Sequence, residues 1–244
     1  MDFTIEELTM NAWPSLQTIV YNGWIIRMAS GYTKRTNSVN PIYSFENNID
    51  YKINYCENIY RKNNLPVIFK IIECNEYKIL DQKLETLNYE KIDLTSVQIC
   101  DEIKNVKLYE NIKINNYFTE EWKNCLYSCY NINNSETIQT IDKMLKNIKH
   151  EMICVIKMDK GNIAGCGYGV IERGFIGLYD IFVKEEYRGK GYGKEIVETI
   201  LTKGKEIGIK KAYLTVVDNN TIAKNLYMQF GFKEIYKYWY RKKI

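Results

Sequence analysis

The stretch of this chain that points most directly to chemistry is Arg188-Gly-Lys-Gly-Tyr-Gly193. It joins an apolar run typical of a strand, residues 176–183, to an amphipathic run typical of a helix, residues 194–208. Glycines let successive backbone N–H groups turn toward one point, the start of a helix adds about half a positive charge, and Arg188 and Lys190 add full charges. The sequence therefore predicts a site for a phosphate or pyrophosphate at this corner.

Two other glycine loops that bind phosphate do not fit this stretch. A Walker loop needs Gly-Lys followed by Ser or Thr, whereas Lys194 is followed by Glu195. A dinucleotide fingerprint needs a third glycine where this chain has Ile196. Both nucleotide-binding motifs are therefore excluded by spacing.

A second motif follows the loop: Asn220-x-x-Ala223-x-x-Leu226-Tyr227-x-x-x-Gly231-Phe232. Together with Arg-x-x-Gly-x-Gly, it resembles the GCN5-related N-acetyltransferase (GNAT) family over about residues 150–240. The resemblance implies acetyl-coenzyme A (acetyl-CoA) as cofactor, with its pyrophosphate on Arg188, Gly189, Lys190, Gly191, Tyr192 and Gly193. It also implies that Asn220 lies near the pantetheine arm and that Tyr227 protonates the departing thiolate.

The resemblance further implies that the strand before the loop and the strand at residues 214–217 separate to admit the pantetheine. The backbone of Ile181, Phe182 and Val183 would bind that arm, and one N–H near Phe182 or Val183 would face the thioester carbonyl. A base must also take a proton from the attacking amine. Asp180, beside Tyr179 on this strand, is the candidate, and Glu172 in the preceding turn is the alternative.

Composition limits the partners. The chain has 244 residues, 45% of them hydrophobic and 14% aromatic, which suffices for one large domain or two small ones. A net charge of +4, from 34 basic and 30 acidic residues mixed along the chain, favours neither nucleic acid nor an anionic membrane as partner. There is no apolar run of membrane-spanning length, and the first residues are acidic, unlike a signal peptide. We expect a cytoplasmic protein with no membrane partner, and both a monomer and a homodimer remain open.

Seven cysteines and one histidine are scattered along the chain without a Cys-x-x-Cys motif. This pattern predicts no metal site. Cys125 and Cys129 are one helical turn apart and could chelate or bridge, but reduced, buried thiols are the favoured interpretation. His150 is expected at the end of a helix, without a chemical role.

An internal repeat appears at an offset of 143 positions. Phe230–Ile235 falls on Leu87–Ile92, and a helix, a strand, a helix and a strand recur in the same order. In the N-terminal copy the glycine loop is replaced by Phe45–Asp50, and Tyr227 by Leu84. We therefore predict a degenerate GNAT-like module at residues 1–102, without pyrophosphate binding, and a catalytic domain at 103–244. The expected fold class is α/β (α+β), a mixed twisted sheet of GNAT type flanked by helices, in two tandem modules.

Local patterns predict the elements within this frame. Helices are expected at 45–61, 77–87 and 119–130, the last with Thr119 as N-cap, and from Ser135 to about Lys149. Strands are expected at 16–21, 24–28, 65–72, 93–100, 152–158, 163–171 and 175–183, with a linker at 101–116. Residues 31–41 resemble a segment of some two-module GNAT proteins, and a solvated loop is the alternative.

The leading hypothesis is an acetyl-CoA-dependent N-acetyltransferase that transfers acetyl to a primary amine of a small molecule or peptide by direct attack on the thioester. The alternative is a non-catalytic, regulatory module that binds acyl-CoA. Retention of Tyr227 in the C-terminal half favours the enzyme. A fusion of two symmetric half-chains is compatible with either.

Overall fold

The computed structural model describes residues 3–43, 48–104 and 107–243. The helices of this part are α1 (Thr4–Ala12), α2 (Ile49–Lys62), α3 (Lys78–Thr86), α4 (Glu120–Cys129), α5 (Ser135–Lys146), α6 (Tyr192–Glu206) and α7 (Thr221–Met228). The strands are β1 (Gln17–Tyr21), β2 (Trp24–Met28), β3 (Val39–Pro41), β4 (Ile68–Ile72), β5 (Tyr89–Cys100), β6 (Ile112–Asn115), β7 (Glu151–Asp159), β8 (Asn162–Glu172), β9 (Phe175–Val183), β10 (Lys211–Val217) and β11 (Lys233–Lys243). None of the described helices is both long and apolar enough to cross a bilayer.

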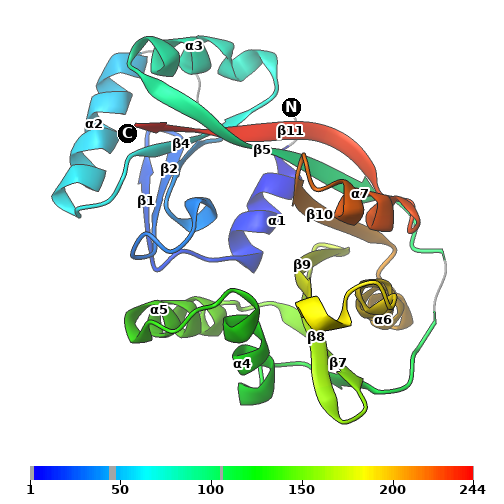
Figure 1. Cartoon of the computed structure of the whole chain (residues 1–244). Helices are drawn as coiled ribbons and strands as arrows, with labels where there is room; N and C mark the ends of the chain where they lie inside the picture. Colours follow the sequence, from blue (N-terminus) through cyan, green and yellow to red (C-terminus); the bar gives the residue numbers. More distant parts are fainter. Residues whose placement is uncertain (1–2, 44–47, 105–106, 244) are drawn as a thin grey trace.

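The described strands form one mixed sheet in the order β1-β2-β3-β4-β11-β5-β10-β9-β8-β7-β6. Two neighbouring pairs, β3 with β4 and β9 with β10, are parallel, and the others are antiparallel. Helices lie against this sheet in both halves of the chain (Figure 1). The predicted α+β class, a mixed twisted sheet flanked by helices, is confirmed.

The internal repeat is visible in the elements themselves. The starts of α2 and α6, of β4 and β10, and of α3 and α7 are each 143 positions apart. The final strands of the two halves, β5 and β11, lie side by side near the middle of the sheet (Figure 1). Thr95 and Tyr238, themselves 143 positions apart, pair with each other across these strands. The two halves are therefore related by a local twofold axis close to this pair.

The final strands are also exchanged between the halves. β11 pairs with β4 of the N-terminal half, while β5 pairs with β10 of the C-terminal half. The C-terminal end of β11 consequently lies beside α2, where Lys243 Nζ is 3.0 Å from Glu57 Oε1 (Figure 1). The sheet of each half is thus completed by the final strand of the other half.

Some predicted boundaries are wrong. The expected linker at 101–116 contains β6, which pairs with β7 at the edge of the sheet; four residues with two polar ones give too short an alternation to recognise. Helix α5 ends at Lys146, so His150 lies beyond it, with Nε2 3.4 Å from a Glu172 carboxylate oxygen. Helix α2 begins at Ile49, and residues 45–47 of the predicted helix are outside the described residues.

Candidate active site

The predicted anion loop lies between β9 and α6. Gly189 and Gly191 have positive φ angles of 79° and 84°, a conformation that favours glycine, and Gly191 directly precedes the first residue of α6. A Cβ atom on either glycine would meet no other atom within 4 Å. The backbone amides at the start of this helix are therefore accessible to a ligand, and the helix dipole favours a negative one.

The cations of the loop are on its exposed side. Lys190 Nζ is 3.1 Å from Asp159 Oδ2, and this contact raises the pKa of Lys190. Arg188 donates from Nε to the Val183 carbonyl oxygen at 3.3 Å, and its guanidinium lies 5.8 Å from the centre of the Phe182 ring. Because these contacts are solvent-exposed, both cations could exchange them for a phosphate oxygen at little cost. Tyr192, which begins α6, has its ring 5.9 Å from Lys190 Nζ.

Strands β9 and β10 separate, as expected, at the end of β9 that leads to the loop. Their parallel pairing covers Phe175–Gly177 and Lys211–Tyr213 and then stops. Just beyond this point, β9 forms a bulge against its other neighbour, β8, because residues 180 and 181 of β9 lie opposite the single residue 167 of β8. Asp180 in this bulge has a positive φ of 46°. A bulge bends the strand that contains it, so the local geometry of β9 opens the gap.

The gap has a backbone donor. The amide of Lys184 donates to the Ala164 carbonyl oxygen on β8 at 2.9 Å. Successive residues of an antiparallel pair face opposite sides, so the N–H of the preceding residue, Val183, faces away from β8 and into the gap. Of the predicted backbone contacts at Ile181, Phe182 and Val183, this alternation favours Val183 as the donor to a carbonyl oxygen.

A cavity of about 490 Å³ lies beside this gap and is built by both halves of the chain. The C-terminal half contributes Tyr130, Tyr179, Asp180 and the end of β10, together with three residues of β11. The N-terminal half contributes Trp13, the segment Gly31–Arg35, Pro66, Ile68, Asp93 and Thr95. The substrate-sized space therefore does not belong to either half alone.

The segment at 31–41 is not a solvated loop. Residues 36–41 are buried, and the Asn37 side chain accepts from the amides of Ala29 and Gly31 at 2.8 and 2.9 Å and donates to the Thr33 carbonyl at 2.8 Å. Arg27 donates to the Arg35 carbonyl at 2.8 Å. These bonds fix the backbone that presents Arg35 to the cavity.

Asp180 is the predicted base that lies on the cavity. It accepts a hydrogen bond from the Tyr130 hydroxyl at 3.0 Å. Burial raises the pKa of Asp180, while the Tyr130 hydrogen bond and the charge of Arg35 partly oppose the shift. The alternative base, Glu172, is outside the cavity and is occupied by Asn11, His150 and Arg173.

Tyr227 of the second motif lies on α7, and Asn220 directly precedes this helix. Tyr227 is 9% exposed, and burial raises the pKa of its hydroxyl to about 12, with a smaller opposing effect of Arg35 and a further raising effect of Asp180. It is therefore protonated at neutral pH. Its ring packs against Phe232, with 5.9 Å between the ring centres, and Tyr227 is not among the described residues that line the cavity. Asn220 is the N-cap of α7, and its side chain accepts from the Ala223 amide at 3.1 Å.

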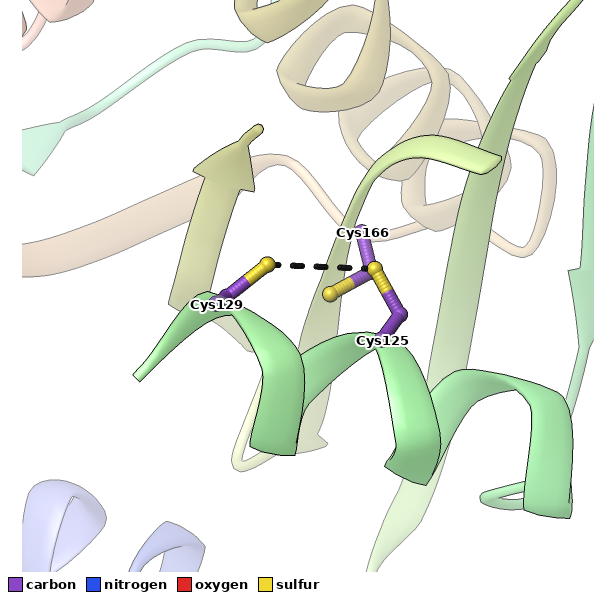
Figure 2. A group of neighbouring side chains, drawn as sticks. All are labelled: Cys125, Cys129 and Cys166. Atoms are coloured by element: carbon purple, nitrogen blue, oxygen red, sulfur yellow. Dashed lines mark hydrogen bonds between the residues drawn. The ribbon is translucent and has the colours of Figure 1, made fainter. Parts of the chain in front are cut away.

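Sequence reasoning missed two features of this region. Tyr130 donates to Asp180 from a distant position, Arg35 lies on the same cavity and acts on Asp180 through its charge, and no local pattern joins the three. Cys125 and Cys129 of α4 also meet Cys166 of β8, with all three sulfur atoms within 4.8 Å of one another (Figure 2). The one-turn spacing of Cys125 and Cys129 was visible in the sequence, whereas the approach of Cys166 depends on the packing of α4 on β8.

Comparison with known proteins agrees with this geometry. Residues 115–232 match the family model described as Acetyltransferase (GNAT) family. The matched segment contains the glycine loop and the second motif, and it identifies a GNAT domain in the C-terminal half of the chain. The chain is 29% identical, over 98% of its own length and 97% of the relative's, to the uncharacterized N-acetyltransferase YobR of Bacillus subtilis. The similarity to YobR thus extends over both halves of the chain, beyond the segment that the family model matches.

Solved structures show the same fold. A GCN5-related N-acetyltransferase from Kribbella flavida superposes with a TM-score of 0.71 at 9% identity, covering 98% of this chain and 94% of that one. A tandem GNAT protein from the clavulanic acid biosynthesis pathway superposes with a TM-score of 0.62 at 9% identity, covering 98% and 87%.

Two relatives with named acceptors match over short stretches. L-ornithine N5-acetyltransferase NATA1 of Arabidopsis thaliana is 34% identical over 25% of this chain and 27% of its own length. Spermine/spermidine N(1)-acetyltransferase of Bacillus subtilis is 35% identical over 25% of this chain and 41% of its own length.

Proposed function

We propose that this GNAT protein uses acetyl-CoA to acetylate a primary amine of a small molecule or peptide by direct attack on the thioester. The observation that carries the proposal is the continuity of three features. An open glycine loop at the start of α6 leads to the gap between β9 and β10, and the gap leads to a cavity with Asp180 on its wall. An elongated ligand with a pyrophosphate at one end and a reactive group at the other fits this series.

The residues present fit acetyl-CoA. The amides around Gly189, Gly191 and Gly193, with Arg188 and Lys190, would hold the pyrophosphate. The edges of β9 and β10 would hold the pantetheine arm. Bound acetyl-CoA would supply the thioester whose acetyl group passes to the amine.

Three groups of the chain would manage charge during the transfer. Asp180, as a carboxylate, would accept the proton of the attacking amine, since a protonated amine cannot attack. The Val183 N–H would stabilise the negative charge that develops on the carbonyl oxygen. The Tyr227 hydroxyl would give its proton to the departing sulfur, so that acetylated amine and free thiol are the products.

The charged residues that line the cavity indicate which kind of amine it would attract. Among the described residues that line it, Lys34 Nζ and Asp93 Oδ2 form an ion pair at 2.7 Å. The other charged residues of this lining are Asp180, Arg35 and Lys242. This balance would attract an amine that also carries a carboxylate, as ornithine does, and would repel a polyamine with several positive charges.

We further propose that residues 103–244 are the catalytic unit and that 1–102 are a degenerate module without a pyrophosphate site. In this module, β4, α3 and β5 follow α2 as β10, α7 and β11 follow α6, but Leu84 takes the place of Tyr227. Its proposed contribution is the wall of the acceptor cavity. No observation favours the non-catalytic alternative.

The test is transfer by the full-length chain. Acetyl-CoA and a panel of amines, with ornithine and spermine among them, would be incubated with the enzyme, and both thiol release and the mass of the acetylated product would be measured. We expect equal amounts of thiol and product with at least one amine. Tight CoA binding without transfer to any amine of the panel would contradict the proposed reaction and support the regulatory module.

A further inference from the structure

The three cysteines next to the proposed active site form a compact cluster, which we call the thiol cluster: Cys125 and Cys129 on α4 and Cys166 on β8 (Figure 2). The sulfur atoms of Cys125 and Cys129 are 3.9 Å apart. Figure 2 shows the three sulfurs converging between the helix and the strand. The four other cysteines of the chain are not part of this group.

The spacing of the sulfurs suits a metal ion. Because the three atoms lie within 4.8 Å of one another, one point is within about 2.8 Å of all of them. A thiolate–zinc bond is about 2.3 Å long, and tetrahedral bond angles then place sulfurs about 3.8 Å apart. The 3.9 Å between Cys125 and Cys129 matches this value, and small side-chain movements would bring Cys166 to the same distance.

The type and number of donors narrow the class of ion. Three sulfur donors without oxygen or nitrogen select soft, thiophilic ions over Mg²⁺ or Ca²⁺. Three thiolates around a divalent ion have a net charge of −1, and the positive charge of Lys184 acts on both Cys125 and Cys129. Monovalent Cu⁺ would leave a charge of −2, so the charge of Lys184 fits a divalent ion better.

The burial of the ligands defines an open side. Cys125 and Cys166 are 2% and 0% exposed, while Cys129 is only partly buried. An ion would therefore approach past Cys129, and a fourth coordination position on that side could be taken by water.

We propose that Cys125, Cys129 and Cys166 bind one divalent thiophilic ion of the Zn²⁺ type. The site would join the C-terminal end of α4 to β8. The next residue, Tyr130, donates to Asp180, and Cys166 is paired with Phe182 across β8 and β9. The bound ion would thereby fix one wall of the acceptor cavity without touching the substrate.

The test uses the full-length chain, reduced with a phosphine and freed of metal by chelation. Zn²⁺ would be titrated against a chromophoric chelator, and Cd²⁺ would be added separately to record thiolate-to-metal charge-transfer absorbance. We expect one Zn²⁺ per wild-type chain. Native mass spectrometry should show a mass increase over the metal-free chain that equals the mass of one zinc ion minus that of the displaced protons.

Variants locate the ion. Cys129→Ser should weaken Zn²⁺ binding at least tenfold and reduce the Cd²⁺ absorbance, since one of three thiolates is lost. Cys74→Ser is the matched control, because Cys74 is also partly buried but lies outside the cluster, and it should bind like wild type. Cys125→Ser should repeat the loss; if that buried change prevents folding, Cys129→Ser decides the matter. Circular dichroism would check that each variant is folded. CoA affinity gives a second check, because no residue of the thiol cluster is among the proposed CoA contacts.

Two results would overturn the proposal. One is a wild-type chain that takes up no Zn²⁺ at micromolar concentration. The other is stoichiometric Zn²⁺ binding that Cys129→Ser leaves unchanged, which would put the ion elsewhere. Neither result depends on acetyl transfer, so the metal site and the proposed reaction can fail separately.

Discussion

Replacing Gly191 by alanine separates the cost of backbone strain from the loss of anion binding. Gly191 has a φ of 84°, where an L-residue costs about 1–2 kcal/mol, and a methyl group there would meet no protein atom. Gly174, in the turn between β8 and β9, has a φ of 77° and equally open surroundings, but lies at the other end of β9 from the loop. The two substitutions should therefore destabilise the fold alike, and only Gly191→Ala should affect CoA.

The expected magnitudes follow from these geometries. For a chain of this size, 1 kcal/mol lowers the melting temperature by about 2–4 °C, so both variants should melt a few degrees below wild type. A methyl group at Gly191 would occupy the space proposed for the pyrophosphate and remove at least one hydrogen bond to a charged oxygen, about 1.5–3 kcal/mol. CoA affinity should fall about 10- to 150-fold in Gly191→Ala alone.

Thermal unfolding and calorimetric titration with CoA would measure both quantities. Equal CoA affinity in Gly191→Ala and wild type would refute the assignment of the pyrophosphate to this loop. An equal loss in Gly174→Ala would show that the effect is transmitted by strain. Gly189→Ala, with a φ of 79° and equally open surroundings, should behave as Gly191→Ala does.

Three further substitutions test the catalytic groups. Tyr227→Phe should lower kcat about 10²- to 10⁴-fold with little change in CoA affinity, because burial keeps the hydroxyl protonated, with a pKa of about 12; stopped-flow or steady-state rates with unchanged kcat would remove the donor role. Burial raises the pKa of Asp180, and only its carboxylate form can accept a proton. As the pH is lowered, kcat/KM should therefore begin to fall at a pH above the usual range for aspartate, and this decrease should be absent in Asp180→Asn. A decrease that persists in the variant would assign it to another group. Arg35→Gln should raise KM for ornithine about tenfold or more and leave KM for spermine unchanged or lower, and an equal rise for both amines would contradict the proposed carboxylate contact.

Much of the frame was readable from the sequence because it rests on local chemistry. The glycine loop and the Thr119 N-cap, which accepts from the Trp122 amide at 3.1 Å, depend on neighbouring residues. The repeat was also visible, since the two halves keep the same order of elements. The geometry of the gap was expected from the resemblance, and the bulge at Asp180 supplies its physical cause.

The remaining features depend on contacts between distant residues. β6 is an edge strand of four residues, and its composition resembles a linker. The thiol cluster needs α4 to pack on β8, and the cavity needs Arg35, Tyr130 and Asp180 to converge from three segments. No periodicity or motif encodes such convergence, so these sites become visible only in the folded chain.

The exchange of β5 and β11 explains why the proposed acceptor cavity lies between the halves. β5 continues the sheet beyond β10, so the space past the gap is bordered by Asp93 and Thr95, residues of the N-terminal half. β11 crosses in the opposite direction and brings Tyr238 and Tyr240 to the same space. The N-terminal half, in which residues 45–50 contain no glycine, is thereby held in place by main-chain hydrogen bonds on both sides of the twofold axis. Loss of the glycine loop from the N-terminal half would then leave its structural role intact, because that role depends on its strands and on the 31–35 segment, and not on a second cofactor.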